Sequence, residues 1–131
     1  MRVFPLGEVN PFGGFFIGKS YLNMLTRSEP VIAQVTFEPG CRNNWHVHRS
    51  SSGGGQILLC LSGKGWYQEW EKPARPLAPG DVVVIPAGVK HWHGAARTSW
   101  FCHLAIEVPG TETSTQWLEP VDEKQYSNVK G

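Results

Sequence analysis

The sequence predicts an all-β sandwich or barrel, and three observations support that prediction. Fifteen glycines and ten prolines divide the 131 residues into short segments. Most of these segments are rich in β-branched and aromatic residues, which are enriched in strands. Only VDEKQY near the end of the chain could form more than one turn of helix. Many short strands separated by Gly/Pro turns are typical of antiparallel all-β architectures.

The expected strands follow one another with turn residues between them. Their ranges are 15–25, 31–40, 56–63, 65–70, 81–88 and 99–108. The turn SGKG at 62–65 is predicted to close a hairpin. The Ser/Gly run at 49–55 offers almost no apolar surface for anchoring, so we expect a mobile flap there. Because the sequence shows no linker and no repeat, residues 1–131 are expected to form a single domain.

Charge and hydropathy argue against several classes of partner. Twelve basic and 11 acidic residues give a net charge of +1, which does not favour nucleic acid or an anionic membrane. No apolar run approaches the roughly 20 residues of a membrane-spanning helix. The N-terminus lacks a signal-peptide pattern, and three cysteines without a CxxC pair are expected to be free thiols in a reducing compartment. We therefore expect a soluble cytoplasmic protein whose partner is a small-molecule substrate.

All five histidines fall at three expected strand positions. Residues i and i+2 of a strand project onto one face about 6.6 Å apart, so His46 and His48 share a face. His91 and His93 repeat this arrangement, and His103 lies on the following strand. Any one of them alone is more often a partly buried residue with an ordinary hydrogen-bond partner. Two HxH pairs and a fifth histidine on one β scaffold favour a metal site.

Two segments resemble the conserved motifs of the cupin family. Residues 40–63, GCRNNWHVHRSSSGGGQILLCLSG, resemble the first cupin motif, and residues 80–95, GDVVVIPAGVKHWHGA, resemble the second. The 16 residues between them match the short spacing of a compact single-domain cupin. The resemblance implies a double-stranded β-helix, or jelly-roll, barrel with a short C-terminal helical turn. It also implies one divalent metal inside the barrel.

The resemblance assigns the metal to three histidines and one carboxylate. The histidines are His46, His48 and His91. At the carboxylate position this chain has Gln56, after a gap of seven residues where the family has three or four. We interpret 49–55 as a lengthened loop and keep Gln56 as a ligand, because its six-residue step to Gly63 fits the motif. The alternatives are that Gln56 is a polar residue at the start of a strand, or that His93 is the fourth ligand in its place.

A glutamine ligand changes the expected chemistry. Three neutral imidazoles and one amide oxygen leave the metal its full +2 charge, which makes it a stronger Lewis acid. The same ligands give less support to higher oxidation states, which argues against oxygen-activating iron chemistry. The resemblance favours manganese, while iron, zinc, nickel and cobalt stay open because these donor types suit all of them.

The resemblance narrows to a group of small bacterial cupins. VTFEPGCRNNWHVH, GKGWYQEW and the terminal WLEPVDEKQY are similar to the manganese-dependent hydroxynitrile lyases and to cupins related to carboxymuconolactone decarboxylase. We expect that neither His93 nor His103 is a metal ligand, and that at least one of them is a neutral imidazole near the metal that accepts a proton. The implied pocket residues are Ala33, Val35, Asn43 and Glu107. Glu107 stands where those lyases have glutamine, so it adds a charge that counts against cyanohydrin cleavage.

Three functions stay open at this point. The first is a metal-dependent lyase that acts on a small hydroxylated or carbonyl compound, as in the hydroxynitrile lyases. The second is a metal-dependent oxidoreductase or dioxygenase, and the third is a non-catalytic cupin that binds a small ligand. By analogy with other small cupins we also expect a homodimer or a higher homo-oligomer, in which the apolar segment FFIG pairs across the dimer.

Overall fold

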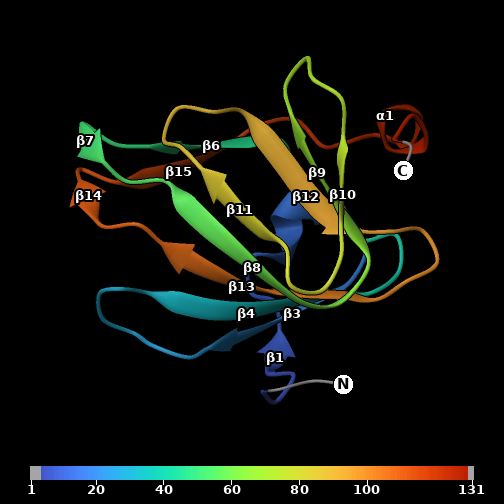
Figure 1. Ribbon diagram of the computed structural model, residues 1–131, viewed down its shortest axis with the longest axis horizontal. Helices are drawn as coiled ribbons and strands as arrows, with labels where there is room; N and C mark the ends of the chain where they lie inside the picture. Colours follow the sequence, from blue (N-terminus) through green and yellow to red (C-terminus); the bar gives the residue numbers. More distant parts are fainter. Residues whose placement is uncertain (1–3, 130–131) are drawn as a thin grey trace.

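The computed structural model describes residues 4–129, which form two facing β-sheets, a small two-stranded sheet and one short α-helix (Figure 1). The first sheet has six strands. In spatial order they are β1 (Glu8–Val9), β3 (Ser20–Met24), β4 (Ile32–Phe37), β13 (Phe101–Glu107), β8 (Gln56–Gly63) and β11 (Val82–Ile85). All the neighbouring strands in this sheet are antiparallel.

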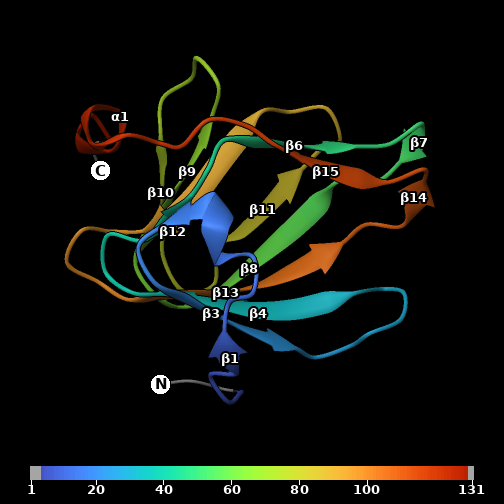
Figure 2. The ribbon, with the colours of Figure 1, turned by 180° about the vertical axis from the view of Figure 1, so that it is seen from behind.

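The second sheet has seven strands and carries most of the histidines. Its strands are β10 (Arg75–Leu77), β9 (Gly65–Glu69), β12 (His91–Ala95), β5 (Arg42–Asn43), β2 (Phe16–Ile17), β6 (His46–Arg49) and β15 (Ser114–Trp117). β6 pairs with both β12 and β15, and it runs beside β15 along one side of the molecule (Figure 2). A 3-10 turn at Gly13–Phe15 precedes β2.

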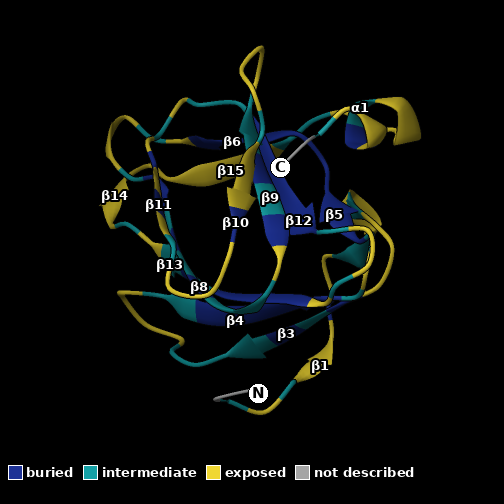
Figure 3. Ribbon diagram, turned by 45° about the vertical axis from the view of Figure 1, so that its right-hand side comes forward, coloured by how far each residue is buried: buried dark blue, intermediate teal, exposed yellow. Residues whose placement is uncertain are grey.

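Both sheets contribute to one hydrophobic core, so their inner faces pack against each other. Phe37, Leu58 and Phe101 come from the six-stranded sheet, and Tyr67 and Ala95 come from the seven-stranded sheet. Figure 3 shows this buried inner layer between exposed turns and strand ends. The all-β prediction is confirmed, and the two sheets form the open jelly-roll arrangement that the motifs implied.

The predicted helical turn is also present. α1 spans Glu123–Ser127 and begins with a capping box, in which Asp122 accepts from the backbone N–H of Gln125 at 2.8 Å. Tyr126 on this helix donates its hydroxyl to the carbonyl oxygen of Ala95 at 2.6 Å, which ties α1 to the end of β12. Among residues 4–129, no helix has the length and apolar character needed to cross a bilayer.

The prediction of a hairpin at 62–65 is wrong. β8 pairs with β13 and β11, whereas β9 pairs with β12 and β10, so this turn carries the chain from one sheet to the other. A tight Gly-rich turn has the same sequence pattern whether it closes a hairpin or joins two sheets, because contacts outside the turn determine which strands pair. Gly63 adopts φ +74°, and a Cβ built there would lie only 1.7 Å from the carbonyl oxygen of Trp100.

Two other segments differ from expectation. The FFIG segment ends the 3-10 turn and forms β2, which pairs with β5 of the same chain, so its pairing across a dimer stays a prediction. The Ser/Gly run at 49–55 includes β7 (Ser52–Gly53), which pairs with β14 (Gly110–Thr111). Backbone hydrogen bonds therefore anchor this loop in place of apolar contacts, and its mobility stays a prediction.

The two motif glycines Gly63 and Gly80 offer a matched test of this fold. Both have positive φ, but a Cβ at Gly80 would meet no atom within 4 Å. We expect Gly80→Ala to lose only the backbone term, about 1 kcal/mol of unfolding free energy. Gly63→Ala should lose about 1–3 kcal/mol more, because the added methyl group overpacks against the backbone at Trp100. Equal losses of the two variants in urea unfolding would contradict this account of the sheet-to-sheet turn.

Candidate metal centre

Three histidine side chains meet between the sheets because of strand register. β6 and β12 are antiparallel with His46 directly opposite His91, and His48 lies two residues further along the same face of β6. One ring nitrogen from each of the three histidines lies within 4.8 Å of the other two. All three side chains are buried. These residues could hold a single metal ion.

Backbone carbonyl groups set the tautomers of two of these rings. Nδ1 of His46 lies 2.8 Å from the carbonyl oxygen of Asn44, and Nδ1 of His91 lies 2.9 Å from that of Val89. A carbonyl oxygen can only accept a hydrogen bond, so each Nδ1 carries the proton and each Nε2 keeps a lone pair. Metal-binding histidines commonly donate their other ring nitrogen to a backbone carbonyl group in this way.

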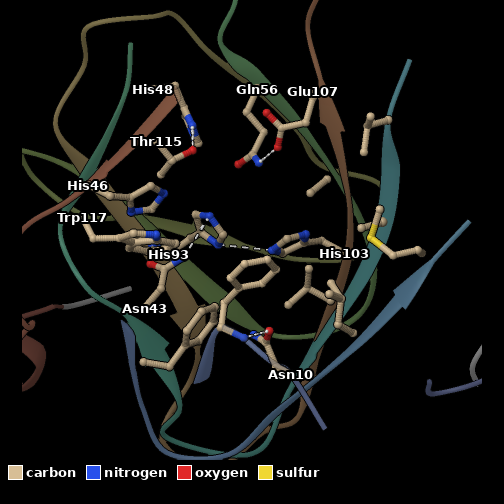
Figure 4. A pocket seen from close by; sticks show the side chains of 18 residues that line it. Asn10, Asn43, His46, His48, Gln56, His93, His103, Glu107, Thr115 and Trp117 are labelled. Atoms are coloured by element: carbon tan, nitrogen blue, oxygen red, sulfur yellow. Dashed lines mark hydrogen bonds between the residues drawn. The ribbon is translucent and has the colours of Figure 1, made fainter. Parts of the chain in front are cut away.

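Gln56 faces the same space from the other sheet. It occupies the first position of β8 and shares an inward face with Leu58 and Cys60. Its Nε2 donates to Oε1 of Glu107 at 2.6 Å (Figure 4). Because the carboxylate holds the amide nitrogen, the orientation of the amide is set and its oxygen faces away from Glu107. Glu107 stands opposite Gln56 in the register of β13 with β8.

Gln56 and Glu107 line the same cavity as His48 (Figure 4). Burial lowers the pKa of His48, while the negative charge of Glu107 and the side chain of Gln56 oppose that shift. Nδ1 of His48 also lies 3.4 Å from Oγ1 of Thr115 on β15.

Three buried acceptor atoms at this place have no hydrogen-bond partner among residues 4–129. They are Nε2 of His48, Nε2 of His91 and Oε1 of Gln56. A buried polar atom without a partner costs free energy, and such atoms are rare in folded proteins. A cation held between the histidines would satisfy the two imidazole nitrogens, and nitrogen and oxygen donors of this kind suit divalent transition metals. The side chains therefore fit a divalent metal ion.

Burial keeps the three imidazoles in the neutral form that metal binding requires. Burial lowers the pKa of His46 well below its ordinary value of 6.5, and repulsion from His91 adds to this. It also lowers the pKa of His91 to about 4. No proton therefore has to leave these two rings at pH 7 before a metal binds.

His93 and His103 form a second histidine pair next to the first cluster. Nδ1 of His93 lies 3.2 Å from Nε2 of His103, and Nε2 of His93 lies 3.2 Å from Nδ2 of Asn43. Both nitrogens of His93 are therefore occupied, which differs from the free imidazole expected from the sequence. Nδ1 of His103 is buried and has no hydrogen-bond partner among the described residues. Burial lowers the pKa of both rings, to about 4 for His103.

The β-strand carrying His103 is irregular at this residue. In the pairing of β13 with β8, the register shifts between Cys102 and His103. Such bulges change the direction of a side chain and often lie next to functional sites. At this irregular position the ring of His103 contacts His93, which lies on the seven-stranded sheet.

A cavity of about 360 Å³ adjoins both histidine clusters. The four pocket residues expected from the resemblance, Ala33, Val35, Asn43 and Glu107, all line it. His46, His48, Gln56, His93 and His103 line it as well, whereas His91 is fully buried and absent from its wall. Most of the remaining wall is apolar and includes Phe16, Leu22, Met24 and Ala105. A cavity of this size and character suits a small organic molecule.

Four further lining residues escaped sequence reasoning. Asn10 and Phe12 come from the N-terminal arm, and Thr115 and Trp117 come from β15. The ring of Trp117 lies 4.7 Å from that of His46 and stacks on Phe15 at the same distance. The polar tetrapeptide of β15 is a weak strand signal, and the arm has no periodic pattern. The aromatic residue in the terminal segment WLEP was the one available signal.

The geometry agrees with three comparisons. The profile of the cupin domain family matches residues 33–104. The chain is 44% identical over 94 residues to an (R)-mandelonitrile lyase from Granulicella tundricola, which covers 72% of this chain and 69% of that protein. A cupin-like protein from Thermotoga maritima has a TM-score of 0.86 at 38% identity, covering 100% of this chain and 99% of that one.

A third protein agrees in fold alone. A Klebsiella pneumoniae protein with a double-stranded β-helix domain has a TM-score of 0.66 at 21% identity, covering 91% of this chain and 98% of that one. The family match spans β4 to β13 and so includes both histidine motifs. The chain belongs to the cupin family.

Proposed function

We propose that this cupin binds one divalent metal and cleaves a small cyanohydrin into a carbonyl compound and hydrogen cyanide. The observation that carries the proposal is the set of three unpartnered buried acceptors beside a cavity of small-molecule size. The similarity to a protein named (R)-mandelonitrile lyase supports the class of reaction.

The proposed ligands are Nε2 of the three clustered histidines and Oε1 of Gln56. Manganese, which the resemblance implies, is the first candidate, and iron, zinc, nickel and cobalt suit the same donors. When bound, a divalent metal at this position would supply Lewis acidity that makes a hydroxyl group easier to deprotonate. The remaining chemistry belongs to the side chains of the cavity.

The proposed reaction needs no oxidant. The hydroxyl proton leaves the oxygen, an oxygen lone pair forms the C=O bond, and the C–C bond breaks with its electron pair going to the cyanide carbon. The departing cyanide takes up a proton and leaves as hydrogen cyanide. His93 and His103 are the imidazoles of the cavity wall outside the metal cluster, so we propose that they position the substrate for this step.

The cavity wall favours a substrate with an apolar substituent. Leu22, Met24, Val35 and Ala105 would contact an aryl or branched alkyl group. Glu107 counts less strongly against a neutral cyanohydrin than its charge alone suggests, because its carboxylate accepts the hydrogen bond from Gln56. We propose that its role is to support the fourth ligand.

The first test is metal content. We expect the purified protein to carry about one divalent metal per chain, and the His46→Ala/His91→Ala variant to carry none, because half of the four donors are gone. Elemental analysis after dialysis measures both. His103→Ala is the matched control, since it removes a cavity histidine outside the cluster and should retain the metal. Full occupancy in the double variant would refute the assigned ligands.

The second test concerns the support of Gln56 by Glu107. Glu107→Leu removes the acceptor, so metal affinity in calorimetry should fall about 10- to 100-fold, as for other groups that orient a ligand. Glu107→Gln keeps an oxygen that can accept from Gln56, and we expect a smaller loss. Glu29→Gln is the control, because it removes a charge from an adjoining cavity. An unchanged affinity in Glu107→Leu would show that Gln56 needs no such support.

The third test is turnover. The manganese-loaded protein should release benzaldehyde and cyanide from mandelonitrile. His93→Ala and His103→Ala should retain metal and lose about 100-fold of the rate, as expected for groups that position the reacting atoms. An oxygen electrode monitors the same samples with candidate substrates. Oxygen uptake without cyanide release would favour an oxidoreductase, and the absence of both reactions would favour a binding protein.

A further inference from the structure

Asn43 has its amide orientation set by the backbone. Oδ1 of Asn43 lies 2.9 Å from the backbone nitrogen of His93, and an N–H group can only donate. The oxygen must therefore face that N–H, which leaves the NH₂ group facing Nε2 of His93 at 3.2 Å. A flipped amide would set two donors against each other at the backbone contact.

This orientation determines the proton positions on the neutral His93 ring. The NH₂ group of Asn43 can only donate, so Nε2 of His93 must accept and carries no proton. The proton of His93 then lies on Nδ1, which is 3.2 Å from Nε2 of His103. His93 is therefore the donor of that bond, and Nε2 of His103 is the acceptor.

The same logic extends to the last ring. With Nε2 of His103 accepting, the proton of the neutral His103 ring must lie on Nδ1. The three side chains are 2%, 4% and 0% exposed for Asn43, His93 and His103, so bulk water does not compete for these hydrogen bonds. Antiparallel pairing of β5 with β12 holds Asn43 next to His93.

We propose that Asn43 is a positioning residue that sets the direction of the Asn43–His93–His103 hydrogen-bond chain and keeps the Nε2 lone pairs of both rings engaged. Nδ1 of His103 is the one nitrogen of this pair without a partner among the described residues, and its ring lines the cavity (Figure 4). With both Nε2 lone pairs engaged and both Nδ1 atoms protonated, neither neutral ring has a free lone pair for a proton of the ligand. This replaces the proton acceptor expected from the sequence.

The proposal rests on the proposed function and deepens it, because it excludes His93 and His103 as the first acceptors of the hydroxyl proton. The proton of the hydroxyl group must then go to a different acceptor.

The test is the tautomer of each ring, read from long-range ¹H–¹⁵N spectra of protein labelled in histidine. Spectra recorded at pH 8 on metal-free and zinc-loaded protein, with assignment by single His→Gln variants, should show His93 and His103 both protonated on Nδ1. A proton on Nε2 of His93, or a doubly protonated ring, overturns the proposal. The metal-free spectrum does not depend on metal binding, so failure of the metal assignment would be seen separately.

A pair of variants tests the role of Asn43 itself. In Asn43→Asp the carboxylate can only accept, so both rings should switch to the Nε2-protonated tautomer. Asn10→Asp is the matched control, because Asn10 is also buried, lines the same cavity and donates its amide to Ser20. It should leave both tautomers unchanged. Wild-type tautomers in Asn43→Asp overturn the proposal, and if that variant does not fold, the wild-type spectrum alone decides.

Discussion

The antiparallel pairing of β6 with β12 is the constraint on which the rest of the site depends. It sets His46 opposite His91, and the two-residue period of a strand then adds His48 from one side and His93 from the other. The first three become a cluster within 4.8 Å, and His93 is directed to the neighbouring pair with His103. A one-residue slip of either strand would turn the two histidines of that strand to the opposite face.

Hydrogen bonding then divides five buried histidines into two functional sets. Backbone carbonyl groups hold the protons of His46 and His91 on Nδ1, which leaves Nε2 lone pairs free to bind a cation. In the second set, Asn43 and the adjacent ring occupy both nitrogens of His93. The same residue type therefore offers free ring nitrogens at the proposed metal site and hydrogen-bonded ring nitrogens in the neighbouring pair. The difference comes from the partner atoms, because burial affects both sets alike.

Gln56 stands where the cupin motif has a carboxylate, and this difference gives the neighbouring Glu107 a different role. A carboxylate at position 56 would supply the negative charge of the cupin motif itself, whereas the amide is neutral and its orientation must be held from outside. Glu107 accepts from that amide across β8 and β13. The site thus keeps a carboxylate, but this carboxylate contacts the proposed ligand Gln56 and not the proposed metal. This arrangement lets the proposed metal retain more of its charge toward a ligand in the cavity.

The sequence by itself determined the longer strands, which residues share a face, and that three histidines and a glutamine occupy the positions of the cupin motifs. These features depend on local pattern, namely the period of two and the turn residues. The tertiary structure alone decided that SGKG joins two sheets, that β15 completes the cavity, and that Asn43 and Glu107 orient His93 and Gln56. The last two contacts join residues 50 and 51 positions apart. Such contacts depend on the register between distant strands, which one-dimensional spacing does not contain.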